Sequence, residues 1–125
     1  MDIFEAAKTG NNQRIIELLN NGININSKNI NGGTPLMLAT LYSNSTSSLE
    51  TVKLLLDRGA DIEAKENNGW TALMFATRYS NSTSSLDTVK LLLDRGTDIN
   101  YKDIAGWTAL MGAALDRMVR ISCDF

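Results

Sequence analysis

The side chains that most often carry enzyme chemistry are almost absent from this sequence. It contains no histidine and a single cysteine, Cys123. Nucleophilic triads that depend on histidine and zinc sites built from cysteine and histidine are therefore excluded within the chain. The only basic residue fixed close to Cys123 along the chain is Arg120. Nothing in the sequence therefore predicts an activated thiol.

Carboxylates are the remaining side chains that could act as acids, bases or metal ligands. Four of them recur at a spacing of 37 residues, Asp57 with Asp94 and Asp61 with Asp98. Such pairs could form an acid–base site or a calcium site, but a recurrence that follows the repeat of the chain indicates capping and solvated faces. The glycine pair at 32–33 lacks the spacing of a phosphate-binding loop. We therefore predict no catalytic residue, no cofactor and no metal site.

The composition is that of one globular domain. The chain has 125 residues, of which 43% are hydrophobic and 21% are charged, close to an average soluble protein. The net charge of -2 gives no electrostatic reason to bind a phosphate backbone, so nucleic acid is not expected as a partner. The first ten residues mix charged and apolar side chains, and no long apolar run follows. We therefore expect an intracellular, cytoplasmic monomer without a signal peptide or a membrane span.

An internal repeat dominates the sequence. At an offset of 37 residues many positions are identical, and the run 42–49 recurs unchanged as 79–86. Two glycine positions and one threonine position are the same in three successive units: Gly22, Gly59 and Gly96; Gly32, Gly69 and Gly106; and Thr34, Thr71 and Thr108. A fixed period of this size predicts a stack of similar units, each of which buries its apolar face against the next.

Each unit carries the signals of two helices. Thr34 followed by Pro35 is typical of a helix start, and this first helix should run to about Tyr42. Thr71 and Thr108 should cap the equivalent helices.

A second helix is predicted over Leu49–Asp57, with its apolar residues on one face. Its start has the form of a capping box, Ser47 with Glu50, and the next unit repeats it as Ser84 with Asp87. The glycine that follows each second helix should end it in a left-handed conformation, at Gly59 and Gly96.

The segments between the helices are polar. The ten residues after each of those glycines, 60–69 and 97–106, predict an extended turn around one buried isoleucine, Ile62 or Ile99. The stretches between the two helices of a unit, 43–48 and 80–85, should project from the stack and be mobile.

These units resemble the ankyrin repeat. The strings that carry the resemblance are GTPLMLA at 33–39, VKLLLDRGADI at 52–62 and NGWTAL at 68–73, and the likeness extends from Asp2 to about Leu115. It implies an all-α fold, a solenoid of stacked antiparallel helix pairs with projecting β-turn fingers. The period is 37 residues in place of the family's 33, because the loop between the two helices is four residues longer.

The resemblance implies one domain over residues 1–125, made of a capping repeat at 1–32, repeats at 33–69 and 70–106, and an incomplete repeat at 107–125. Two departures accompany it. Methionine replaces the family's usual histidine, which removes a hydrogen bond between repeats, at Met37, Met74 and Met111. The expected last helix is also missing, so that residues 109–122 form either one closing helix or a frayed tail.

In this family the ligand-facing positions are commonly the fingers and the exposed edge of the first helices. Carried over residue by residue, they imply a protein-binding surface of Lys65, Asn67, Asn68, Trp70, Lys102, Ile104, Ala105 and Trp107, with Lys28, Ile30, Asn31 and Gly33 in the first finger. The two tryptophans either anchor a partner or pack against their own and neighbouring fingers. The units differ mainly at 63–68 against 100–105 and at Leu41 against Arg78. These differences reflect either recognition of a partner or neutral sequence drift at tolerant surface positions.

The resemblance implies a non-enzymatic protein–protein interaction module whose partner is another protein. The abundance of asparagine and isoleucine makes the chain similar to ankyrin proteins of large DNA viruses or intracellular bacteria, which implies a host protein as that partner. Two alternatives stay open. One is a truncated remnant of an expanded repeat family without a partner of its own, and the other is an adaptor that presents a host protein to a ubiquitin ligase.

Overall fold

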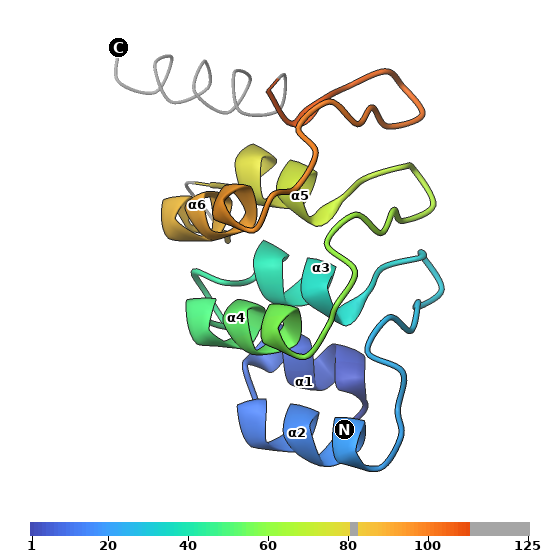
Figure 1. The fold of residues 1–125 in the computed structure, drawn as a ribbon, viewed down its shortest axis with the longest axis vertical. Helices are drawn as coiled ribbons and strands as arrows, with labels where there is room; N and C mark the ends of the chain where they lie inside the picture. The colour runs from blue at the N-terminus through green and yellow to red at the C-terminus, as the bar shows by residue number, and fades with distance from the viewer. Residues whose placement is uncertain (81–82, 111–125) are drawn as a thin grey trace.

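The computed structural model describes residues 1–80 and 83–110. Three helix pairs follow one another along these residues, and each pair is stacked on the one before it (Figure 1). The pairs are α1 (Ile3–Thr9) with α2 (Asn12–Asn20), α3 (Pro35–Leu41) with α4 (Leu49–Asp57), and α5 (Ala72–Arg78) with α6 (Leu86–Asp94). None of the described residues lies in a β-strand. The expected all-α solenoid is confirmed.

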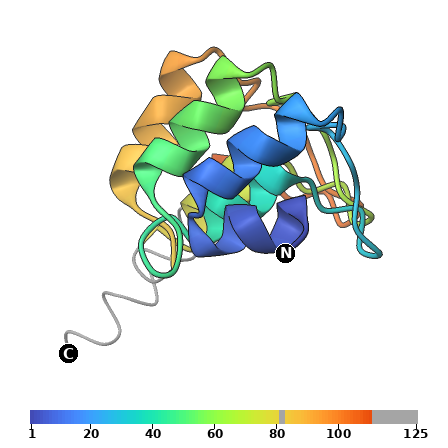
Figure 2. The same ribbon diagram turned by 90° about the horizontal axis from the view of Figure 1, so that it is seen from below.

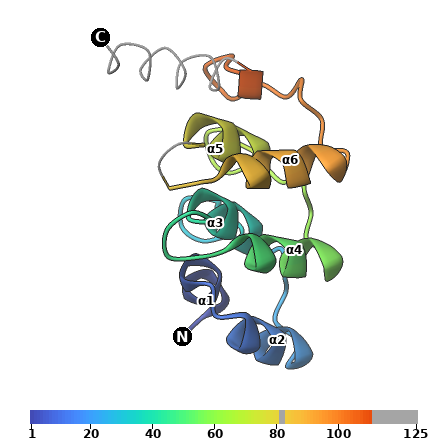
Figure 3. The same cartoon turned by 90° about the vertical axis from the view of Figure 1, so that its left-hand side faces the viewer.

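The helices form two layers. The first helices of the pairs, α1, α3 and α5, lie one above another, and the second helices α2, α4 and α6 form a parallel column beside them (Figure 3). The fifth residue of each first helix is an alanine, and these alanines, Ala7, Ala39 and Ala76, are completely buried. Their small side chains allow the three helices to approach closely. Leu55 of α4 and Leu92 of α6 fill the space between the layers and are also completely buried.

Threonine starts the first helices as predicted. The Oγ1 atom of Thr34 accepts the amide of Met37 at 3.3 Å, and that of Thr71 accepts the amide of Met74 at 3.4 Å. Thr108 precedes Ala109, where the chain is helical again. The helix expected over residues 109–122, and the frayed tail that is its alternative, lie outside the described residues, as does Met111.

The predicted capping serines of the second helices are wrong by one residue. Ser48, not Ser47, caps α4 by accepting the amide of Thr51 at 3.2 Å, and Ser85, not Ser84, caps α6 in the same way. The reason is that the earlier serine has another partner. Ser47 donates its hydroxyl to the carbonyl of Ala7 at 2.7 Å. Ser84 is completely buried, with its hydroxyl 3.4 Å from that of Ser43.

The loop 43–48 extends past the helix ends and is hydrogen-bonded to the pairs on both sides. Thr46 donates to the carbonyl of Lys8 at 2.7 Å, and the amide of Asn44 donates to the carbonyl of Thr83 at 2.9 Å. Within the described chain the hydroxyl of Thr88 also donates to that of Ser43 at 2.7 Å. The extra residues of the period therefore add contacts between units. The mobility expected of this loop stays a prediction.

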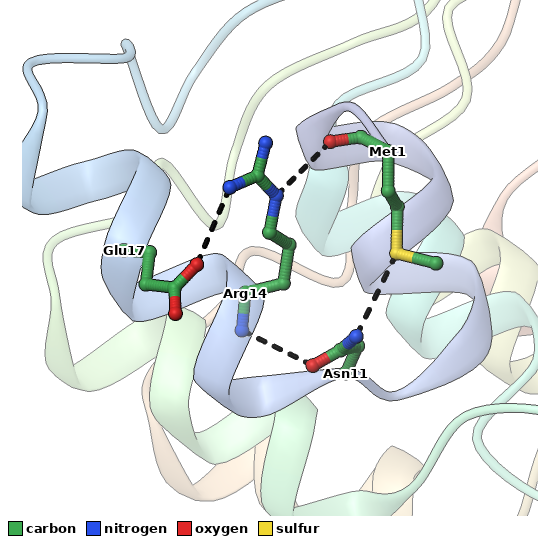
Figure 4. Close-up of polar contacts among 4 residues, drawn as sticks. All are labelled: Met1, Asn11, Arg14 and Glu17. Atoms are coloured by element: carbon green, nitrogen blue, oxygen red, sulfur yellow. Dashed lines mark hydrogen bonds and ion pairs between the residues drawn. The ribbon is translucent and has the colours of Figure 1, made fainter.

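The segment before α1 is attached to α2 through Arg14 (Figure 4). The guanidinium Nε of Arg14 donates to the carbonyl of Met1 at 3.2 Å, and another nitrogen pairs with Glu17 at 3.3 Å. The amide of Arg14 donates to the side chain of Asn11, which caps α2. These partners are exposed, so the ion pair contributes little to stability and mainly orients the first residues.

Burial of the turn isoleucines differs from the prediction in the last unit. Ile62 is partly buried against the core, as expected, but Ile99 is 54% exposed. Leu86 and Leu93 of α6 are exposed as well. These residues belong to the last helix pair of the described chain, so no further described pair covers them. No helix in the described ranges has the length and apolar character needed to cross a membrane.

Candidate binding groove

Three short turns project from the same side of the stack, one after each helix pair (Figures 1 and 2). We call the segments 29–33, 66–70 and 103–107 the first, second and third finger. In each finger the amide of the first residue donates to the carbonyl of the fifth at 2.9 Å. The fourth residue is a glycine with a φ of 81° or 82°. The fingers therefore share one backbone geometry.

The first residue of each finger also fixes the turn with its side chain. Asn29, Glu66 and Asp103 occupy this position, and one oxygen of each accepts the amides of the third and fifth finger residues at 2.6–3.0 Å. The prediction from sequence missed these three residues. The available signal is an oxygen acceptor three residues before the finger glycine in all three units.

Neighbouring fingers are joined by equivalent hydrogen bonds between their backbones. The amide of Asn67 donates to the carbonyl of Asn31 at 3.0 Å, and the amide of Ile104 donates to the carbonyl of Asn68 at 2.8 Å. The ammonium of Lys28 reaches the carbonyl of Lys65 at 3.0 Å. Each finger is therefore held at a fixed distance from the next.

The structure divides seven of the eight predicted surface residues into two groups, and the eighth, Asn68, is exposed and donates its amide to Glu66 of its own finger. The side chains of one group contact neighbouring parts of the described chain. Trp70 donates from Nε1 to Oδ2 of Asp103 at 2.8 Å, with its ring centroid 4.9 Å from that of Phe75. Lys65 has its Nζ atom 4.1 Å from the ring centroid of Tyr101, and Asn67 donates its side-chain amide to the carbonyl of Ile30 at 3.2 Å. The other group is exposed and has no side-chain hydrogen bond among the described residues, namely Lys102, Ile104, Ala105 and Trp107.

A groove runs between the fingers and the first helices. It consists of three hollows that share residues. The first and middle hollows share Glu66, Asn68 and Phe75, and the middle and last hollows share Trp70, Asp103 and Ala105. The residues of the first helices and of their C-caps that line it are Met37, Leu38, Leu41, Tyr42, Met74, Phe75, Arg78 and Tyr79. The predicted residue set named only finger residues and the lysine directly before a finger, although the difference between Leu41 and Arg78 was noted at this edge of the first helices.

The carboxylate of Asp103 is held in its charged form. Backbone hydrogen bonds, above all from the amide of Trp107, lower the pKa of Asp103 from its ordinary value of 3.8, and the bond from Trp70 acts in the same direction. Three of the four carboxylates singled out in the sequence, Asp57, Asp61 and Asp98, have structural partners. Asp57 pairs with Arg95 at 2.7 Å, and Asp61 and Asp98 accept amides two residues further on.

Replacing Asp103 by asparagine should reduce the loss of stability in acid. Because the folded chain has the lower pKa, the stability from this carboxylate is present above pH 3.8 and is lost as the pH falls through the folded pKa. Urea denaturation at about pH 5.5 and about pH 3 should show a smaller decrease for Asp103→Asn than for wild type. Asparagine fits this position, since Asn29 makes the same turn.

The control is Asp94→Asn, which removes an exposed carboxylate that accepts no finger amide and should keep the wild-type decrease. An equal acid sensitivity of wild type and Asp103→Asn would contradict the prediction.

No group of three histidine, cysteine or carboxylate side chains placed to hold a metal ion occurs among the described residues.

A family model described as ankyrin repeats (3 copies) matches residues 3–103 and again residues 66–121. No curated protein matches the chain.

Proposed function

Because the chain belongs to the ankyrin-repeat family, we propose that it is a non-enzymatic module that binds another protein along the groove and its fingers. Members of this family generally act in protein–protein interactions. The division of residues 1–125 into a capping repeat, two full repeats and an incomplete repeat is part of the proposal.

The observation that carries the proposal is a continuous groove with a preformed shape. Aromatic side chains line all three hollows, from α5 and the helix C-caps in the first two and from the fingers in the last, and the finger backbones are hydrogen-bonded to one another. Exposed tryptophan and tyrosine are typical anchors of protein interfaces. A surface that is already ordered loses little conformational entropy when a partner binds, which favours affinity.

Trp107 is the most direct probe of this surface. Its side chain is 43% exposed and lines the last hollow. Trp70 is less suitable, because its removal would also break the hydrogen bond to Asp103. Leu86 on α6 provides a control, since it is 72% exposed and lines none of the three hollows.

The test is affinity capture from a lysate of host cells with wild type, Trp107→Ala and Leu86→Ala, each shown by circular dichroism to keep its helices. We expect a protein that wild type and Leu86→Ala retain and Trp107→Ala loses. The same retained proteins for all three chains would contradict binding through the last hollow. If Leu86→Ala alone failed to retain the partner, the binding surface would lie on α6 instead.

The finer roles depend on this binding step. Sequestration of a host protein and its presentation to a ubiquitin ligase both require a captured partner. We propose that the chain acts inside the cell and as a monomer in either role.

The second candidate is a remnant without a partner, and the exposed Leu86, Leu93 and Ile99 favour it. Sedimentation at increasing concentration separates the two, because an uncovered apolar face should promote self-association.

A further inference from the structure

The last hollow combines two tryptophans with one cation. Trp70 and Trp107 occupy the same position in successive fingers. Met74 and Ala105 add apolar surface, and Arg78 of α5 also lines the hollow. The volume is about 250 Å³. This is below the roughly 300–1,000 Å³ typical of sites for drug-sized molecules. The hollow therefore suits one or two side chains of a polypeptide.

Most of the hydrogen-bonding capacity of the acidic group in the hollow is already used, because three donors contact a carboxylate with about four acceptor sites. Oδ1 of Asp103 accepts the amides of Ala105 and Trp107 at 2.8 and 2.9 Å, and Oδ2 accepts Nε1 of Trp70 at 2.8 Å. Three donors thus point at this carboxylate and offset its charge. Glu66, in the neighbouring middle hollow, likewise accepts two amides of its own finger.

Arg78 is different, because it forms no ion pair with a carboxylate of any described residue. Its guanidinium carbon lies 5.3 Å from the ring centroid of Tyr79. A planar guanidinium can donate two parallel hydrogen bonds to a carboxylate. The hollow therefore has a cation that is available to an acidic group from outside, directly beside an apolar surface.

The fold does not require this charge. Leu41 occupies the equivalent position on α3 and lines the first hollow. An apolar side chain is thus accommodated at the same point of a nearly identical unit. Arginine at position 78 changes the chemistry of one hollow while the helix pair stays the same.

We propose that the last hollow binds an extended segment of the partner protein in which an acidic side chain is adjacent to an aromatic or large aliphatic one. The acidic group pairs with Arg78, and the apolar side chain lies against Trp107 and Met74. A nucleic acid is a poor fit, because the net charge is -2 and two of the three charged groups along the groove are acidic. This inference rests on the proposed function and specifies its partner.

The test is selection of peptides from a random twelve-residue phage library on the purified full-length chain. We expect enriched peptides to contain Asp or Glu within two residues of an aromatic or large aliphatic residue. A synthetic peptide of the enriched sequence should bind about tenfold more weakly to Arg78→Leu by fluorescence anisotropy, the loss expected for one hydrogen-bonded charge pair. Arg58→Leu is the matched control, since Arg58 caps α4 and lines none of the hollows.

A change on the peptide side leaves the folding of the chain untouched. Replacing the peptide's Glu by Gln should weaken binding to wild type by a similar factor and leave binding to Arg78→Leu unchanged, because both changes remove the same pair. Enriched peptides without an acidic residue, or equal affinity for wild type and Arg78→Leu, would overturn the inference, and so would a failure to enrich any peptide. The lysate capture with Trp107→Ala needs no peptide, so failure of the proposed function appears there separately.

Discussion

Replacement of Leu55 by alanine should lower the free energy of unfolding by about 2–5 kcal/mol, the range measured for buried leucines. Leu55 is completely buried between the two helix layers. The substitution removes apolar surface from the core and leaves a cavity that the surrounding helices can fill only in part. The same change at Leu92 of α6, which is also completely buried, should fall within this range.

The measurement is equilibrium urea denaturation followed by circular dichroism. Leu86→Ala is the matched control, because Leu86 lies on α6 as well but is 72% exposed. It should change the free energy of unfolding by no more than about 0.5 kcal/mol. A loss below about 1 kcal/mol at Leu55 would mean that the stacked core is packed less tightly than the structure indicates.

The second large effect is expected at Gly32 of the first finger. Its φ is +81°, a conformation that costs a residue with a Cβ atom roughly 1–2 kcal/mol. A Cβ atom at this position would also lie 2.8 Å from the backbone nitrogen of Asn67 in the next finger. Asn67 would have to move, which breaks its hydrogen bond to Asn31 and adds roughly 1–3 kcal/mol.

Gly106 isolates the backbone part of this effect. It has nearly the same conformation, with a φ of +82°, but a Cβ atom there would meet nothing within 4 Å. Gly106→Ala should therefore cost only the roughly 1–2 kcal/mol of the left-handed conformation. The difference between Gly32→Ala and Gly106→Ala in urea denaturation measures how tightly the fingers are stacked. Equal losses would show that the first two fingers separate easily.

Local signals were sufficient to predict most of the fold. The predicted second helix, Leu49–Asp57, coincides with α4, and Thr34 and Thr71 cap the first helices as expected. Hydroxyl caps, proline at the first helical position and apolar periodicity act over a few residues, so they can be recognised in a single sequence. The 37-residue period then implied the stacking.

Properties that depend on a neighbouring unit were harder to predict. Ser47 looked like a helix cap, but its hydroxyl contacts Ala7, which is distant in sequence. Ile99 occupies the same position of the repeat as Ile62, after an aspartate in both units, but it is exposed where Ile62 is partly buried. The residues of the binding surface were likewise predicted from their position in the repeat alone. Position in the repeat does not show that Trp70 donates a hydrogen bond to Asp103 or that Phe75 and Arg78 line the groove.

The hydrogen bonds between the fingers have a consequence for how the gene can change. Each bond joins the second residue of one finger to the third residue of the preceding finger, with Asn67 donating to Asn31 and Ile104 donating to Asn68. Among the described residues, each finger is therefore held by its immediate neighbours. Unequal recombination that duplicates or deletes 37 residues in register would recreate the same bond at the new junction. The copy number can thus vary during evolution without any compensating mutation elsewhere in the chain.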